Sequence, residues 1–383
     1  MKKVKVGIVG LGRLGRTHAE NLAFGIPGAE LTAACSIVDS ELSYAKEQLG
    51  VEKTYFDFAA MCQDPDIDAV VIVSPSTYHP EQISLALKAG KHVFCEKPLA
   101  VTLEECKATE EEVKKYPDQV FMLGFMRRYD PSYAYAKKKI ESGAIGTPYL
   151  VKATGVDPDA DAESLLDSGF VPKSGGIMMD MASHDIDLMR WFLQDDPAEV
   201  YAVGSTVKHP RFREQGDVET ACATFKFKNG AMGQLHVGRA SVHGYHIETE
   251  IIGTEGSIRV SPVPCKNLAM LYDKTGAVQE CVRNFPERFH QAYVEEMKEF
   301  IDCIVEKRTP GVDVHDGTQA TLICAAAQKA LETGAIVTIR TLQRQNFFFI
   351  RYKSFKCWAP LAPSRSDNAT TSASTNAAAA VME

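Results

Sequence analysis

Two short stretches of the sequence carry side chains that could move a proton to or from a substrate hydroxyl. In Glu96-Lys97-Pro98 a lysine stands beside a proline, and a cation at such a turn could stabilise an alkoxide that forms as its carbon gives up hydride. In the second stretch Asp180 and His184 are four residues apart, so a helix from Met179 onward would stack them on one face. Histidine titrates near neutrality and could take the hydroxyl proton, while the carboxylate orients its ring. These residue types predict the dehydrogenation of an alcohol.

Both stretches also have an ordinary structural interpretation. A lysine on a loop is usually only solvated, and an Asp–His pair often lies on the surface of a helix. We expect Asp185 and Asp187, which follow the histidine, to cap or solvate the same helix. The position of the two stretches relative to a nucleotide site decides between the interpretations.

A glycine-rich turn near the N-terminus predicts such a nucleotide site. Gly10-Leu11-Gly12-Arg13-Leu14-Gly15 directly follows the apolar run over residues 4–9 and precedes a helical pattern. Gly10 permits the tight turn, Gly12 lets the backbone approach a pyrophosphate, and Gly15 lets helix and strand pack closely. The N-terminus of the helix then points its N–H groups at the phosphates.

The residue that meets the adenosine ribose decides between NAD and NADP. An acidic side chain at the tip of the second strand would accept a hydrogen bond from the 2′-hydroxyl and favour NAD. That strand ends near Ser36, where no carboxylate would repel a 2′-phosphate, although no arginine follows to attract one. Asp39 favours NAD if it reaches back to the tip. NAD is the predicted cofactor, and NADP stays open as the alternative.

The first third of the chain alternates short apolar runs with helix-sized intervals. Near-continuous apolar runs of this length are typical of parallel strands that helices cover on both faces. The expected strands span residues 4–9, 31–35, 69–73, 92–95 and 120–123, with a helix over 18–24. This pattern predicts a doubly wound Rossmann domain over residues 1–124. Glu96-Lys97-Pro98 then lies just past the fourth strand, at the sheet edge where open α/β folds bind ligands.

Beyond Gly124 the pattern changes to alternation of apolar and polar residues. A hairpin is expected over residues 220–237 around Asn229-Gly230, and a second antiparallel pair over residues 247–260. The expected helices are Met179–Leu193, Tyr293–Glu306 and Gly317–Thr333. The fold class is therefore α/β plus α+β, with a second domain over residues 125–339 built on a mainly antiparallel sheet. Residues 340–383 are expected to be a disordered tail, because they show no period that could bury a core face.

Composition and charge limit the class of partner. The 383 residues hold 42 Lys and Arg against 50 Asp and Glu, and the net charge of −8 disfavours nucleic acid and anionic membranes. No apolar run reaches the ~18–20 residues of a transmembrane helix, and the N-terminus lacks a secretory pattern, so the expected location is cytoplasmic. The ten cysteines include no C-x-x-C pair, and most are expected to be buried thiols. No metal site is predicted.

Several motifs in this order resemble the Gfo/Idh/MocA oxidoreductase family and, within it, the bacterial inositol dehydrogenases. The resemblance covers about residues 4–339. The stretches that carry it are Gly10–Gly15 with His18, Ser74–His79, Glu96-Lys97-Pro98-Leu99, Gly124–Asp130, Ser174-Gly175-Gly176 and Asp180–Asp187. It implies a Rossmann domain and a second domain whose open sheet face mediates dimers and tetramers. A homo-oligomer is therefore expected, either a dimer or a tetramer, with the homotetramer as the first choice.

The resemblance also implies roles for particular residues. It makes Lys97, Asp180 and His184 the catalytic set, with His184 as the proton acceptor and Lys97 in contact with both substrate and cofactor. Outside the glycine-rich turn, the implied cofactor-binding residues are Ser74, Pro75, His79, Glu96, Lys97 and Arg127. The implied substrate-binding residues are Lys97, Arg127, Asp157, Asp180, His184 and Tyr245.

The implied reaction is the oxidation of a secondary hydroxyl of a cyclic polyol to a ketone, with myo-inositol and 2-keto-myo-inositol as the first choice. Three positions depart from the family pattern. Ser36 stands where NAD-using members often carry aspartate, His246 stands where inositol enzymes usually have aspartate, and Val156 stands where arginine is frequent. They leave scyllo-inositol, an aldose or a sugar derivative open as the substrate. A nucleotide-binding sensor without catalysis is the alternative from another class, although a sensor needs no catalytic set.

Overall fold

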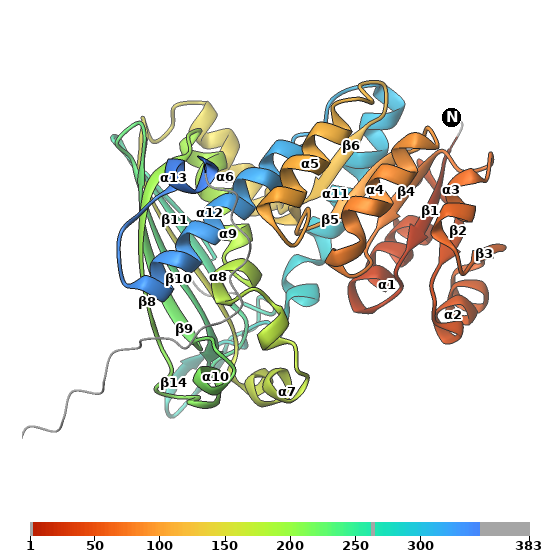
Figure 1. The fold of residues 1–383 in the computed structure, drawn as a ribbon. Coiled ribbons are helices and arrows are strands. Elements are labelled where there is room, and N and C mark those ends of the chain that lie inside the picture. The colour runs from red at the N-terminus through yellow and green to blue at the C-terminus, as the bar shows by residue number, and fades with distance from the viewer. Residues whose placement is uncertain (1–2, 262–264, 345–383) are drawn as a thin grey trace, which may run out of the picture.

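The computed structural model describes residues 3–261 and 265–344. It places two sheets next to each other, one of six strands and one of seven (Figure 1). The expected tail lies outside the described residues from residue 345 on. Its first part is ordered, which corrects the expected limit: helix α13 spans Ile339–Arg344, and Leu342 is 4% exposed in the core under the larger sheet. Leu342 adds one apolar side chain from the expected tail to this core, and one apolar residue is too few to show a helical period in the sequence.

The smaller sheet is wholly parallel, as its apolar runs predict. The strand order is β3-β2-β1-β4-β5-β6. The strands are β1 (Val4–Val9), β2 (Ala29–Cys35), β3 (Lys53–Tyr55), β4 (Ala69–Ile72), β5 (His92–Glu96) and β6 (Phe121–Gly124). Strand β3 has only three residues at the sheet edge, too few for a pattern, so Glu96-Lys97-Pro98 follows the fifth strand rather than the fourth. The order reverses between β1 and β4, and open α/β sheets bind ligands at this switch point.

Helices cover both faces of the parallel sheet. They include α1 (Arg13–Glu20) with the π-helix η1 (Asn21–Gly25), α2 (Asp39–Leu49), α3 (Phe58–Gln63), η2 (Ser76–Tyr78), α4 (His79–Lys88) and α5 (Leu103–Val113). Helix α11 (Phe285–Glu306) returns from late in the chain and buries Met297 and Phe300 in the same cluster as Val6 and Ile8 of β1. Helix α12 (Val314–Thr333) also begins beside this sheet, where Val314 is buried. Packing therefore crosses the sequence boundary at residue 124.

The larger sheet is mainly antiparallel, in the order β12-β11-β7-β10-β9-β8-β15. Its strands are β7 (Pro148–Pro158), β8 (Pro197–Ser205), β9 (Thr220–Phe227), β10 (Met232–Ser241), β11 (His246–Gly253), β12 (Ser257–Val260) and β15 (Val337–Thr338). Both expected hairpins are confirmed: β9 pairs antiparallel with β10 across Asn229-Gly230, and β11 pairs with β12. Strands β7 and β10 lie side by side in parallel.

Helices pack on one face of the larger sheet. Helix α9 (Ser183–Leu193) and the C-terminal part of α12 share a buried cluster with inward residues such as Phe225 and Leu235. Residues of the opposite phase, such as Tyr201 and Thr224, are exposed on the outer face. The remaining elements are η3 (Met126–Tyr129), α6 (Pro131–Glu141), η4 (Asp159–Asp161), α7 (Ala162–Asp167), η5 (Val171–Lys173), α8 (Ile177–Asp180), α10 (Arg211–Glu214), β13 (Leu271–Asp273) and β14 (Gly276–Val278).

The expected helix Met179–Leu193 is interrupted. Helix α8 ends at Asp180 and α9 begins at Ser183, so Asp180 and His184 belong to different helices. The start of α8 is set by Gly176, whose φ is +94° and whose added Cβ would overlap the side chain of Gln328. Its first N–H, on Ile177, donates to Asp217 of the adjoining loop at 3.1 Å. Tertiary contacts therefore set the direction of α8 independently of α9.

The burial of the cysteines and the apolar character of the helices bear on two expectations from the sequence. Of the nine cysteines described, Cys222 and Cys265 are exposed and the others are buried; Cys357 lies outside the described residues. In residues 3–261 and 265–344, no helix combines the length and apolar character needed to cross a membrane.

Candidate active site

The turn between β1 and α1 has the shape of a phosphate-binding turn. Gly10 has a φ of +86°, and a Cβ there would lie 2.7 Å from the carbonyl oxygen of Val73 after β4. A Cβ on Gly15 would overlap the carbonyl oxygen of Gly10, whereas one on Gly12 would meet nothing within 4 Å. Gly12 is the N-cap of α1, and no side chain caps the first N–H groups of this helix. The turn therefore fits the pyrophosphate of a dinucleotide, which helix N–H groups bind.

Glu41 is the acidic residue that reaches this turn, and Asp39 is not. The Glu41 carboxylate accepts hydrogen bonds from the Ser36 hydroxyl at 2.5 Å and from the Leu11 N–H at 3.3 Å. Asp39 is exposed as the first residue of α2. The tip of β2 therefore has a carboxylate beside it, from a residue that the sequence analysis missed. Its position in the first turn of a helix, where acidic residues are favoured, is the signal that could have indicated it.

A buried imidazole holds the loops after β4 and β5 together. The ring nitrogens of His79 lie 2.9 Å from the carbonyl oxygen of Ser74 and 2.8 Å from that of Pro98, and the residue is 1% exposed. Burial lowers the pKa of His79. Ser74 is half-buried and Pro75 is exposed at the same sheet edge. Both ring nitrogens of His79 contact carbonyl oxygens of the two loops, so this side chain positions the loops. Its burial does not support the expected contact with the cofactor.

A cavity of about 570 Å³ lies between the two sheets, beside the start of α1. All of the expected substrate-binding residues line it: Lys97, Arg127, Asp157, Asp180, His184 and Tyr245. Arg13 and Leu14 of the glycine-rich turn line the same cavity, as does Glu96 at the end of β5. The structure therefore brings together residues from the parallel sheet, α8, α9 and the larger sheet next to the dinucleotide turn.

His184 and Lys97 supply the acid-base groups of this cavity. His184 is 9% exposed, and its pKa is held well below the usual range by burial and by the positive charges of Lys97 and Arg127. An uncharged imidazole at neutral pH can accept a proton. The Nζ of Lys97 lies 3.5 Å from the carbonyl oxygen of Asp180, which places the cation at the cavity wall.

Asp180 is paired with Arg239 instead of His184. Its carboxylate accepts a hydrogen bond of 2.6 Å from Arg239 Nη2, and Asp157 lies 3.5 Å from Nη1 of the same arginine. The expected stacking of Asp180 on His184 is thus corrected, because the chain turns at Met181 between the two helices. Burial raises the pKa of Asp157 to about 6, aided by the charge of Asp180. The side chain of Asp157 is 37% exposed, but this surface borders the cavity.

Arg239 is the main site residue that sequence reasoning missed. It lies on β10, whose alternate residues Gly233, Leu235 and Val237 point into the core, and Arg239 continues this buried phase. A charge on the buried phase of an alternating strand is costly unless it is paired, so such a residue signals a site or an ion pair. The alternation was visible in the sequence and could have indicated it.

Asp185 and Asp187 are buried partners of two arginines, which corrects the expectation that they cap or solvate the helix. Arg127 Nη1 donates to Asp185 at 2.6 Å, and Arg128 donates to both oxygens of Asp187 at 2.8 and 2.6 Å. These aspartates are at most 1% exposed. The pairs tie η3 to α9 and hold Arg127 at the cavity wall. Tyr245 also lines the cavity, and burial raises the pKa of its hydroxyl.

Two family models match most of the chain. One, described as "Oxidoreductase family, NAD-binding Rossmann fold", matches residues 4–125, and the other, described as "GFO/IDH/MocA C-terminal domain", matches residues 133–259. Together they cover the elements that form the glycine-rich turn, the Lys97 loop, α8, α9 and Arg239.

The chain also matches named relatives over nearly the full length of those proteins. The chain is 37% identical to myo-inositol 2-dehydrogenase of Thermotoga maritima over 86% of this chain and 96% of that protein. It is 36% identical to scyllo-inositol 2-dehydrogenase (NAD(+)) of Bacillus subtilis, over 88% of this chain and 96% of that protein. The crystal structure of scyllo-inositol dehydrogenase from Lactobacillus casei with bound NAD(H) and scyllo-inositol superposes with a TM-score of 0.86 at 43% identity, covering 88% of this chain and 100% of that one.

Proposed function

The chain belongs to the GFO/IDH/MocA oxidoreductase family, and on this premise we propose that it oxidises a secondary hydroxyl of an inositol to a ketone with NAD. The observation that carries the proposal is the shared cavity. This cavity is lined by Lys97, Asp180 and His184 and also by Arg13 and Leu14 of the dinucleotide turn. A hydroxyl bound there is within reach of a proton acceptor and a cation beside the cofactor site.

The residues divide the reaction between them. NAD, when bound, supplies the acceptor for the hydride, which carries two electrons away from the carbinol carbon. His184 takes the hydroxyl proton, and its uncharged state at neutral pH allows this. Lys97 stabilises the negative charge that develops on the oxygen as the proton leaves. The carbinol thereby loses one hydride and one proton and becomes a ketone.

A polar wall opposite these groups suits a ring with several hydroxyls. Asp157, Asp180 and Arg239 are linked to one another and line the cavity. Carboxylates accept and guanidinium groups donate hydrogen bonds, so the three side chains can bind adjacent hydroxyls. A site built to bond each hydroxyl rejects analogues that lack one, because its buried polar groups would be left unpaired.

myo-Inositol is our first choice of substrate, and scyllo-inositol is the second candidate. The relative from Thermotoga maritima is named for myo-inositol, whereas the solved structure at 43% identity is named for scyllo-inositol. The two cyclitols differ in the orientation of one hydroxyl, and oxidation at that carbon gives the same ketone from both. Product identification alone therefore does not distinguish them.

A panel of substrates and cofactors tests the proposal. Purified protein is mixed with myo-inositol, scyllo-inositol, glucose or a sugar derivative, each with NAD or NADP, and absorbance of reduced nicotinamide is followed. We expect turnover with an inositol and NAD, and the larger kcat/KM identifies the cyclitol. Turnover confined to an aldose would refute the inositol assignment. Nucleotide binding without any turnover would instead support the sensor.

The preference for NAD over NADP rests on Glu41. Its carboxylate adjoins Ser36 and the Leu11 N–H, at the ribose end of the turn. A 2′-phosphate there would bring a second negative charge close to it, and like charges in contact are costly. The 2′-hydroxyl of NAD can donate a hydrogen bond to the same carboxylate.

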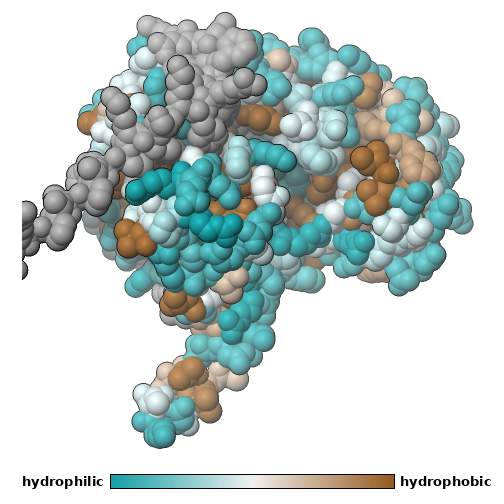
Figure 2. Space-filling view, turned by 60° about the horizontal axis from the view of Figure 1, so that its bottom comes forward, coloured by the Kyte–Doolittle hydropathy of each residue, from teal (hydrophilic) through white to brown (hydrophobic). Residues whose placement is uncertain are grey.

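We also propose that the protein is a homo-oligomer, with the homotetramer first, and the cytoplasm stays our predicted location. Two surfaces support association: the outer face of the larger sheet, and the hairpin of β13 and β14. Leu271 and Tyr272 of that hairpin are 60% and 76% exposed, and Leu268 just before it is fully exposed. Figure 2 shows an arm that projects from the body and carries hydrophobic side chains. Exposed apolar groups of this kind mark contact surfaces, and an isolated hairpin is marginally stable alone.

A further inference from the structure

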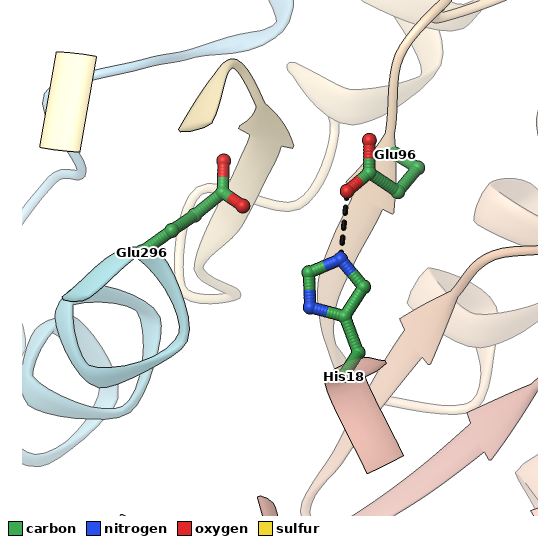
Figure 3. Close-up of side chains that lie close together, drawn as sticks. All are labelled: His18, Glu96 and Glu296. Atoms are coloured by element: carbon green, nitrogen blue, oxygen red, sulfur yellow. Dashed lines mark hydrogen bonds and ion pairs between the residues drawn. The ribbon is translucent and has the colours of Figure 1, made fainter. Parts of the chain in front are cut away.

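Three ionisable side chains meet in a buried cluster behind Lys97. His18 comes from α1, Glu96 from the end of β5 and Glu296 from α11 (Figure 3). His18 and Glu296 are not exposed at all, and Glu96 is 5% exposed. One nitrogen or oxygen of each lies within 4.8 Å of the others. The cluster joins the helix of the dinucleotide turn, the strand that leads to Lys97 and the helix that returns from the second half of the chain.

Glu96 is the centre of this cluster, and both of its oxygens have partners. His18 Nε2 donates to Oε1 at 2.7 Å, and the backbone N–H of Lys97 donates to Oε2 at 3.2 Å. Gly124 leaves the room for this, since a Cβ there would lie 3.0 Å from the Glu96 carboxyl group. The histidine and the carboxylate are thus already paired with each other. A metal ion bound to all three residues would have to break the His18–Glu96 bond.

Glu296 points toward this pair but has no charged partner. Neither of its oxygens has a hydrogen-bond partner among the described residues, and the same holds for His18 Nδ1 and the nearby Tyr129 hydroxyl. The ionisable groups that face it are Glu96 on β5, His18 on α1, Tyr129 on η3 and Tyr293 one turn before it on α11. The described contacts include no lysine or arginine.

A carboxyl group in this position is stable as the neutral acid. Burial penalises the charged form, and the negative charge of Glu96 penalises it further, so the pKa of Glu296 lies well above its usual range. A neutral carboxyl has an O–H to donate as well as an oxygen that accepts. The neutral form can therefore support the His18–Glu96 pair without adding a second negative charge.

We propose that Glu296 and His18 are positioning residues for Lys97: the buried side chain of Glu296 lies beside the His18–Glu96 pair, and Glu96 holds the backbone N–H of the lysine. The chain of contacts runs from the helix of the dinucleotide turn through His18 and Glu96 to the Lys97 N–H. These contacts therefore connect the helix of the dinucleotide turn to the loop that carries Lys97. The role assigned to Lys97 rests on the proposed function, whereas the protonation of Glu296 does not.

Infrared spectroscopy of the full-length protein without substrate tests the protonation. A protonated carboxyl has a C=O stretch above the amide band, and we expect such a band in the wild-type protein at neutral pH. It should disappear in Glu296→Gln and persist in Glu295→Gln, which changes a neighbouring carboxyl on the same helix that Gln291 contacts near the surface. A band that persists in Glu296→Gln, or no band in the wild type, would overturn the neutral acid. So would stoichiometric metal in the purified wild-type protein that Glu296→Gln lacks.

Kinetics test the positioning role. Glu296→Gln keeps the shape and the neutral charge, so kcat per NAD-binding site should stay within about twofold of wild type. Glu296→Ala should lower kcat about tenfold, because it leaves a void beside the His18–Glu96 pair, with the KM for inositol unchanged. If Glu296→Gln is as slow as Glu296→Ala while both bind NAD fully, an ionised carboxylate is needed and the proposal fails. If the wild type oxidises no polyol, the proposed function fails, and the infrared result still decides the state of Glu296.

Discussion

The proposed role of His184 as the general base needs an uncharged imidazole. Burial and the charges of Lys97 and Arg127 hold its pKa well below the usual range. We expect His184→Ala to lower kcat by about 10²–10⁴-fold, the usual contribution of a general base. The binding of NAD, followed by fluorescence titration, should be unchanged because the turn at Gly10–Gly15 is intact. Wild-type turnover in this variant would contradict the assignment.

Asp157 gives the site a predicted pH dependence. Its pKa is raised to about 6, so the carboxyl is largely neutral at pH 5 and largely ionised at pH 7. If the ionised form pairs with Arg239 and binds a hydroxyl, the KM for inositol should fall as the pH rises through about 6. The pKa of His184 is lowered by burial and by the charges of Lys97 and Arg127, and its titration does not account for a change that Asp157→Asn removes. Steady-state KM between pH 5 and 8 should show the change in wild type and not in Asp157→Asn.

Glu41 should govern the choice of cofactor. In Glu41→Gln the amide oxygen can still accept hydrogen bonds, but the charge that repels a 2′-phosphate is gone. We expect the ratio of kcat/KM for NAD to that for NADP to fall about tenfold, or ~1.4 kcal/mol, which is the scale of one close charge pair near a surface. Asp39→Asn is the matched control and should change the ratio less than twofold. A larger change in Asp39→Asn than in Glu41→Gln would instead support the predicted role of Asp39 at the adenosine ribose.

At the scale of elements, two ion pairs attach η3 to α9. Arg128 donates to both oxygens of Asp187, and both side chains are buried. Removing Asp187 takes away the bidentate partner of the buried Arg128, which keeps Asp316 at 3.0 Å. Asp187→Ala should therefore lower the free energy of unfolding by ~3 kcal/mol, the lower end of the range for broken buried pairs. Urea denaturation followed by circular dichroism measures this.

The control for that prediction is an exposed ion pair. Glu111 accepts from Lys114 on the surface of α5, and Glu111→Ala should leave the unfolding midpoint nearly unchanged, because exposed pairs are screened by water. Equal effects of the two substitutions would mean that burial does not distinguish them and that the Arg128–Asp187 pair is not needed for the fold.

At the scale of the whole molecule, the β13–β14 hairpin is predicted to contact a second copy. Replacing Leu268, Leu271 and Tyr272 with serine removes three of the exposed apolar side chains of the arm. The assembly should then dissociate at a higher protein concentration than the wild type does. Light scattering coupled to size exclusion gives the mass of the assembly at each concentration. Val207→Ser, which changes another exposed apolar residue, should leave the mass unchanged. An unchanged mass in the hairpin variant would exclude the arm from the interface.

Local patterns were enough to predict several of the elements, although β3, β7 and β8 had no prediction. The glycine-rich turn, the parallel strands and both hairpins follow from spacing within about twenty residues, which is the range over which backbone geometry acts. The motifs around Lys97, Asp180 and His184 indicated residues that line one cavity. The predicted helix Met179–Leu193 was wrong in its continuity, because contacts with Asp217 and Gln328 orient its first turn.

The sequence by itself determined the fold class, the dinucleotide turn and the family, because each depends on the type and spacing of nearby residues. Only the tertiary structure decided which charges meet. In the structure Asp180 pairs with Arg239, and Glu41 lies against Ser36 at the tip of β2. Asp185 and Asp187 are buried against arginines, and Glu296 lies beside His18 and Glu96. These partners are separated by up to 278 residues between His18 and Glu296 (296 − 18). The pairing of buried charges depends on distance in space, which spacing along the chain does not encode.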